Sequence, residues 1–292
     1  MLYGCEVWGN ITKTELMMLN KVQKVVAKSI QNLNWRTHDE IVRGLLGWYT
    51  IEAYIDRSKR MFICKLVHMD PCSVTKQVFL KQLYSHITCR NIHNTITYDL
   101  LNVLKSYNLQ DYLYSYLAGG TFPPKAEWKN IIKYNIYRSE ENKWKQGLVQ
   151  KGCHRYINVQ PKLEENILYN IIKQNLRHKP DLMVLLKMLT VPENYEESQC
   201  DLCKSLLNDP VEHTLLHCQC LIEERNIMWD NILNNLDIKL EAELFSAEDS
   251  EVLAVLMGKA SAFVVTPDEK SNFYIGISQS LNIFLNRLNI AD

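Results

Sequence analysis

Four residues in the last third of the chain have the side-chain types and the spacing of a metal site. Cys200 and Cys203 are separated by two residues, and His213 and Cys218 follow in order within 19 positions. A Cys-x-x-Cys turn offers two thiolates from one tight loop, and Zn(II) takes about four such ligands in a tetrahedron. The sequence therefore predicts one structural zinc ion, closed by four protein ligands and without an open position for water.

The second pair of ligands has two alternates. His217 lies four residues after His213 and would share its face on a helix, while Cys220 is close enough to replace Cys218. We expect His213 and Cys218, with His217 next. Two other interpretations of the cluster stay open: buried thiols near surface histidines, or a redox Cys-x-x-Cys pair, whose usual setting of a strand followed by a helix is not apparent.

Most of the chain has the apolar periodicity of amphipathic helices. Apolar residues recur three or four positions apart, as in the stripe Leu16, Leu19, Val22, Val26, Ile30 and Leu33, and strand alternation is weak. The predicted helices cover residues 14–33, 39–46, 51–68, 74–87, 98–116, 125–150, 163–176, 181–189, 223–236, 250–259 and 271–288. The expected fold class is all-α, multi-helical with a small embedded zinc knuckle.

Turn residues and charge divide the chain into four predicted regions. The strongest turn and helix-breaking signal is the Gly- and Pro-rich stretch Gly119–Pro124. We place a boundary there and expect a helical region at 1–118, a basic helical region at 119–190, the zinc knuckle at 191–222 and C-terminal helices at 223–292.

The formal net charge of zero conceals an uneven distribution. Residues 1–90 hold 13 basic and 7 acidic side chains, residues 125–187 hold 13 and 6, and residues 191–257 hold 3 and 15. The basic blocks keep nucleic acid open as a partner. The acidic segment surrounds the knuckle and makes direct phosphate contact there unfavourable. We therefore expect the knuckle to hold its flanking helices together.

Basic and aromatic side chains are interleaved in residues 125–155, and this block has two interpretations. As a binding face, its cations would contact phosphates while its rings stack on bases. As an ordinary helix, its tryptophans would anchor the core and its lysines would be solvated. The candidate nucleic-acid-binding residues are Lys129, Lys133, Arg138, Lys143, Lys145, Arg155, Trp128 and Trp144.

The Cys-Cys-His-Cys cluster, followed by Arg225 and Trp229, resembles the zinc-binding region near the C-terminus of reverse transcriptases from LINE-type, non-LTR retrotransposons. Residues 2–9, Leu-Tyr-Gly-Cys-Glu-Val-Trp-Gly, are similar to the Leu-Tyr-Gly-Ser-Glu-Val-Trp-Gly segment at the end of that family's polymerase thumb. The helices that follow, including the stretch from Gly47 to Lys65, resemble those that come next. The likeness runs from residue 1 to about 229, specific at both ends and loose in the middle.

The resemblance implies a region that helps to hold template RNA or target DNA beside the polymerase. The family's polymerase uses paired aspartates to bind two metal ions, and this chain contains no Asp-Asp dipeptide. The polymerase palm and the endonuclease lie upstream in that family, so we expect a truncated or retained piece and no enzyme. The predicted function is a non-catalytic module that binds RNA or DNA. The alternative is a helical interaction or scaffold protein with no nucleic-acid role.

Other classes of protein are disfavoured by composition. No run of about 18 uncharged apolar residues is present, so no membrane span is expected. The first ten residues lack the basic and apolar regions of a secretory signal, and nine cysteines, an odd number, disfavour a disulfide framework. We expect an intracellular protein, nuclear or cytoplasmic. No phosphate-binding glycine loop and no convincing nucleophile–base pair is found, so no small-molecule substrate is expected.

Overall fold

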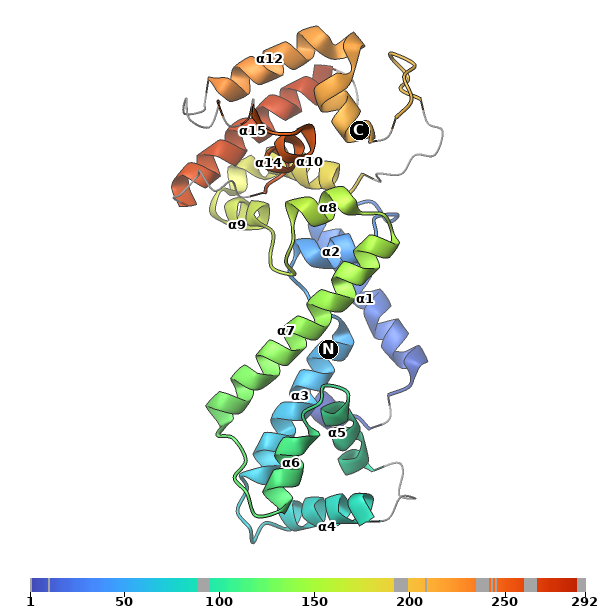
Figure 1. The fold of residues 1–292 in the computed structure, drawn as a ribbon, viewed down its shortest axis with the longest axis vertical. Coiled ribbons are helices and arrows are strands. Elements are labelled where there is room, and N and C mark those ends of the chain that lie inside the picture. Colours follow the sequence, from blue (N-terminus) through green and yellow to red (C-terminus); the bar gives the residue numbers. More distant parts are fainter. Residues whose placement is uncertain are drawn as a thin grey trace. The chain divides into compact units, whose positions relative to one another are not determined.

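The computed structural model describes residues 2–9, 11–88, 95–191, 199–207, 209–234, 242, 244, 246–259 and 267–287, the last with side chains from 270 to 286. Every regular element in these ranges is a helix (Figure 1), which confirms the all-α fold class. The β-type pairing described consists of two isolated antiparallel bridges, Leu46–Glu165 and Gln199–Leu206.

The described helices are numbered in chain order. Their bounds are η1 (Cys5–Val7), α1 (Lys13–Gln31), α2 (Asp39–Leu45), α3 (Ile51–Val67), α4 (Val74–Thr88), α5 (Ile96–Lys105), α6 (Gln110–Leu117), α7 (Lys125–Gln150), α8 (His154–Val159), α9 (Ile167–Gln174), η2 (Leu176–His178), α10 (Lys179–Leu189), α11 (Pro210–Glu212), η3 (His213–His217), η4 (Gln219–Leu221), α12 (Ile222–Leu233), α14 (Asp249–Leu256) and α15 (Pro267–Arg287).

The helix predicted over 98–116 is two helices, α5 and α6. The chain turns at Asn108, whose φ of 56° lies in the left-handed region, and the Leu109 backbone N–H returns to the Leu104 carbonyl at 2.9 Å. Asparagine tolerates this left-handed conformation better than most residues, so it can end a helix. The apolar periodicity carries no information on this break, because the apolar spacing continues across it.

The chain forms two compact units, which cut across the four predicted regions. Unit 1 comprises Met1–Val26 and Tyr49–Lys143, and unit 2 comprises Ala27–Trp48 and Trp144–Asp292. The Gly119–Pro124 stretch lies inside unit 1, because the Phe122 ring packs against Trp128, with ring centroids 4.7 Å apart, and both join one apolar core.

The core of unit 1 encloses a polar cluster on α3. Arg60 is fully buried, its guanidinium lies 3.7 Å from the centroid of the Tyr107 ring, and its carbonyl accepts a hydrogen bond from the Trp128 indole at 3.0 Å. The Tyr107 hydroxyl donates to Asp56 at 3.1 Å. Burial raises the pKa of Asp56 to about 6, although the charge of Arg60 and the hydrogen bond from Tyr107 lower it.

The raised pKa of Asp56 makes the stability of unit 1 depend on pH. The folded chain holds this proton up to about pH 6, whereas the unfolded chain releases it near the ordinary value of about 3.9. The contribution of the neutral carboxyl is therefore fully present below about pH 3.9 and is lost as pH rises through about 6. We expect Asp56→Asn, which imitates the neutral form, to stabilise the chain against urea at about pH 7 and to flatten this dependence.

The matched control for this prediction is Asp111→Asn, an exposed carboxyl on α6 of the same unit. We expect the control to leave the unfolding midpoint unchanged at every pH. A lower midpoint for Asp56→Asn at neutral pH would contradict the prediction.

Unit 2 gathers α2, the end of α7 and the helices that follow. The Trp144 indole donates to the Glu40 carbonyl at 2.8 Å, and its ring meets Tyr156 edge-on at 6.1 Å between centroids. Gly47, with φ of 62°, passes so close to Glu165 that a Cβ there would lie 2.5 Å from the Glu165 backbone nitrogen. Further along the chain, α15 packs against α10 and α12 (Figure 1).

The buried residues of α7 recur at a strict interval of four. Because each residue turns an α-helix by about 100°, a step of four moves the buried stripe by about 40° around the helix. The first residues of this stripe belong to the core of unit 1, and the last two belong to unit 2. The stripe consists of Trp128, Ile132, Ile136, Glu140, Trp144 and Leu148.

Candidate metal centre

The first two candidate ligands lie on a tight hairpin. Residues Gln199 and Leu206 form an antiparallel bridge, and the Cys200 backbone N–H donates to the Ser205 carbonyl at 2.8 Å. Lys204 closes the turn with φ of 62°, and its N–H donates to the Cys200 carbonyl at 2.9 Å. This turn brings the Cys200 and Cys203 side chains to one side, as the Cys-x-x-Cys spacing predicts.

The other two ligands lie at the two ends of one wide helical turn. Asp209 caps the start of α11 by accepting from the backbone of Val211 at 2.8 Å and of Glu212 at 3.3 Å, and Pro210 occupies the first turn. The helix continues as a π turn, η3, in which the Cys218 N–H donates to the His213 carbonyl at 2.7 Å. This bond spans five residues and places His213 and Cys218 on the same side of the turn.

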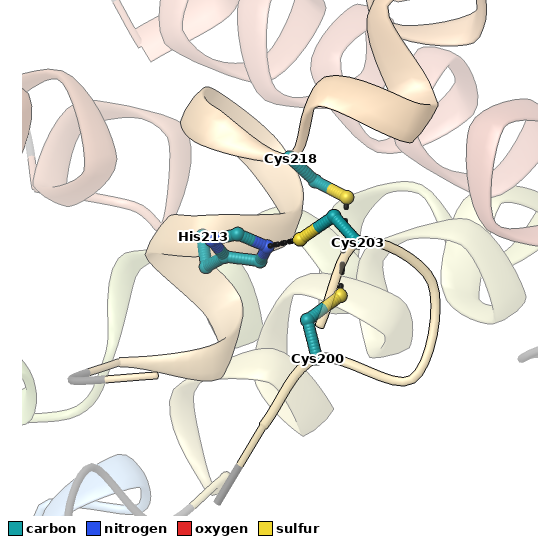
Figure 2. Close-up of side chains that lie close together, drawn as sticks. All are labelled: Cys200, Cys203, His213 and Cys218. Carbon is teal, nitrogen blue, oxygen red and sulfur yellow. Dashed lines mark hydrogen bonds between the residues drawn. The ribbon is translucent and has the colours of Figure 1, made fainter. Parts of the chain in front are cut away.

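Figure 2 shows the four side chains pointing toward one another. The Cys203 sulfur lies 3.2 Å from His213 Nε2, and the Cys200 and Cys218 sulfurs are 3.9 Å apart. All four ligand atoms lie within 4.8 Å of one another. Cys218 is buried and the other three are partly buried. The group can hold a metal ion.

The surroundings shift the pKa values of two of the thiols in opposite directions. Hydrogen bonding with Ser205 lowers the pKa of the Cys203 thiol to about 6, whereas burial raises the pKa of the Cys218 thiol to about 11. Several ionised thiols at these distances would repel one another. A bound cation removes this repulsion and favours the thiolate form of every cysteine around it.

Neighbouring residues fix the turn that carries His213 and Cys218. The Arg155 guanidinium forms an ion pair with both Asp209 oxygens and also donates to the carbonyl of Val191 at 2.5 Å. Arg225 donates to the Cys218 carbonyl at 2.8 Å. The Asp–Pro pair at 209–210 is a helix-start signal that is visible in the sequence, whereas the pairing of Arg155 with Asp209, 54 residues away, has no local signal.

The two alternate ligands lie outside the cluster. Cys220 is exposed, and His217 Nε2 lies 3.5 Å from Glu212 and 3.2 Å from Asp249. The expectation that His217 shares the face of His213 assumed an α-helix. The turn is instead a π turn, so the residue five positions on, Cys218, occupies that face.

The candidate nucleic-acid-binding residues do not form one surface. Trp128 and Trp144 are 0% and 1% exposed, so they are core residues rather than stacking platforms. Arg155, expected to contact phosphate, is buried in its ion pair with Asp209. Lys145 is half-buried. The exposed basic residues of the predicted set are Lys129, Lys133, Arg138 and Lys143.

The exposed cations of α7 occupy two sides of the helix. Lys129 and Lys133 lie one turn apart, whereas Arg138 is rotated by about 140° from Lys133. Lys143 lies 3.5 Å from Glu140 and 4.0 Å from Glu52. The pair Lys129 and Lys133 is therefore the most coherent part of the predicted face.

Within the described parts of the chain, every helix is too short or too polar to span a lipid bilayer. No protein-family model, curated protein or solved structure matches the chain.

Proposed function

We propose that the chain is a non-catalytic helical module that binds RNA or DNA and whose unit 2 is held together by one structural zinc ion. The observation that carries the proposal is the convergence of Cys200, Cys203, His213 and Cys218 within 4.8 Å. Four protein ligands complete the tetrahedral coordination shell of a zinc ion and leave no position for a reacting water. This supports a structural role.

The donor set and its spacing favour zinc among the common metals. Soft thiolates select zinc over magnesium, calcium or manganese. Bonds of about 2.3 Å to sulfur place two sulfurs about 3.8 Å apart around a tetrahedral zinc. The Cys200 and Cys218 sulfurs are 3.9 Å apart, close to that value.

A zinc ion at this place would join two consecutive segments of the chain. The hairpin at 199–206 carries two ligands, and the turn between α11 and α12 carries the others. Leu215, between the last two ligands, is fully buried. The ion would thus act as a cross-link in a region whose many acidic side chains repel one another.

Two observations support the nucleic-acid role. Lys129 and Lys133 are exposed one turn apart on α7, in a basic segment of the chain. The resemblance of the cysteine–histidine cluster and of residues 2–9 to a retrotransposon reverse transcriptase points to the same partner. Lysines placed in this way bind phosphates with little preference for sequence.

The nucleic-acid role is tested by charge reversal on α7. We expect Lys129→Glu with Lys133→Glu to weaken the binding of single-stranded RNA and to reduce the slope of log affinity against log salt by about 1.4, because each lost phosphate contact removes about 0.7. Fluorescence anisotropy of labelled RNA at several salt concentrations measures both quantities.

The matched control is Lys81→Glu with Lys105→Glu, which changes the net charge equally at two exposed lysines of the same unit. We expect this control to keep the salt slope. Equal effects of the two double variants would show that only overall charge matters and would remove α7 as the binding element.

A helical interaction protein is the second candidate, and one observation favours it. The part of α1 that belongs to unit 1 exposes five apolar side chains, Met17, Met18, Val22, Val25 and Val26, each more than 40% accessible. Contiguous apolar surface of this kind marks binding sites for other proteins. The two candidates differ in salt dependence, because apolar docking persists at salt concentrations that release nucleic acid.

A further inference from the structure

His217, which the four-ligand cluster leaves out, belongs to a second group of metal-ligating side chains. Its Nε2 atom lies 3.5 Å from Glu212 Oε1 and 3.2 Å from Asp249 Oδ2. One ligand atom of each residue lies within 4.8 Å of the other two. Glu212 precedes the first ligand of η3, His217 ends that turn, and Asp249 begins α14.

A cation at the centre of this group would relieve the repulsion between its two carboxylates. Two carboxylates meet there in a segment, residues 191–257, that carries 15 acidic and 3 basic side chains. A neutral imidazole nitrogen holds at most one hydrogen, so Nε2 can donate to only one of the two carboxylates. A divalent cation can instead accept a lone pair from the imidazole and from both carboxylates at once.

We propose that Glu212, His217 and Asp249 form a second site, which binds a first-row divalent transition metal ion and clamps the knuckle turn to α14. Imidazole with two carboxylates suits ions such as Mn(II), Fe(II) and Zn(II), in contrast to the thiol-rich first site. The three side chains are 35%, 45% and 60% exposed, so water completes the coordination shell and binding is weaker than at the first site.

The proposal goes beyond the structural zinc ion, and it does not depend on it. The two sites differ in ligand chemistry, since the first uses three sulfurs and the second uses none. Manganese is therefore a selective probe, because hard carboxylate oxygens suit Mn(II) whereas thiolates prefer zinc.

The test is a Mn(II) titration of the full chain carrying one zinc ion per chain, with excess zinc removed beforehand and free Mn(II) measured by its electron paramagnetic resonance signal. We expect one saturable Mn(II) site per chain in the wild type. Asp249→Asn and His217→Ala should each lower the Mn(II) affinity at least tenfold, because each removes one of three protein ligands. Asp249 is exposed at a helix start, so its variant is expected to fold.

Two controls match the variants in the kind of side-chain group, in unit and in exposure. Glu251→Gln alters a carboxyl on the same helix that is 59% exposed, and His154→Ala removes an exposed histidine of unit 2. We expect both to retain the wild-type affinity within twofold. The absence of saturable Mn(II) binding in the wild type, or wild-type affinity in either His217→Ala or Asp249→Asn, would overturn the proposal. Zinc content, measured in the same samples, reports separately on the first site.

Discussion

Replacing Cys200 and Cys203 with serine is expected to abolish the proposed zinc binding and to unfold the segment that carries His213 and Cys218. The segment has little regular secondary structure of its own, because its hairpin is closed by one isolated bridge and its helix α11 has three residues. A ligand that binds only the folded state at 1,000 times its dissociation constant stabilises that state by about 4 kcal/mol. We expect a loss of at least this size, measured by thermal unfolding with and without a chelator.

The control for the cysteine variant uses thiols outside the cluster. Cys72→Ser with Cys220→Ser removes two exposed cysteines. We expect this protein to keep one zinc per chain by elemental analysis and to keep its melting temperature. Zinc retained in the Cys200 and Cys203 variant, or lost in the control, would show that the ligand set is wrong.

Replacing Arg155 with methionine is the second change with a large expected effect. Its guanidinium is paired with Asp209, and the side chains of Arg155 and Asp209 are 5% and 15% exposed. Removal of one partner of a buried ion pair costs about 3–5 kcal/mol, because the other charge stays buried without compensation. Asp209 also caps the helix that leads to His213, so we expect zinc affinity to fall about 10- to 100-fold, as for other residues that orient metal ligands.

The Arg155 prediction is checked by chemical denaturation and by competition with a chromophoric zinc chelator. Arg177→Met is the matched control, because Arg177 is an exposed arginine of the same unit. Adding Asp209→Asn to Arg155→Met removes the stranded charge, while the asparagine side chain can still cap the helix. We expect the double variant to recover part of the stability. A double variant less stable than Arg155→Met would refute the stranded-charge explanation.

The sequence was sufficient to predict the fold class and the four side chains that the structure brings together in a group able to hold a metal ion. Helical periodicity is a local signal, and it places α1, α3 and α7 close to their observed bounds. The Cys-x-x-Cys spacing is also local, since a tight turn alone brings Cys200 and Cys203 together. The choice of His213 and Cys218 over the alternates His217 and Cys220 depends on whether one turn is an α or a π turn, which the spacing does not reveal.

Three of the candidate nucleic-acid contacts, Trp128, Trp144 and Arg155, are buried, and this burial depends on tertiary structure. Trp128 and Trp144 fit a stacking surface and a core stripe equally well in the sequence, because both interpretations place them on one helix. Their indole N–H groups are satisfied by carbonyls of Arg60 and Glu40, 68 and 104 residues away. Arg155 likewise looks like a surface cation until Asp209 is placed beside it. Contacts over such separations leave no pattern in the local sequence.

The π turn between His213 and Cys218 bears on how the ligand pattern tolerates insertions and deletions. In a regular α-helix, residues five apart point about 140° away from each other, whereas residues four apart are separated by only about 40°. The π turn absorbs the additional residue and restores the shared direction, as the bond from the Cys218 N–H to the His213 carbonyl shows. A chain with three residues between histidine and cysteine in an α turn would present the same pair of ligands. Divergent versions of this centre are therefore expected to differ by one residue in this interval, and a search pattern with a fixed interval would miss them.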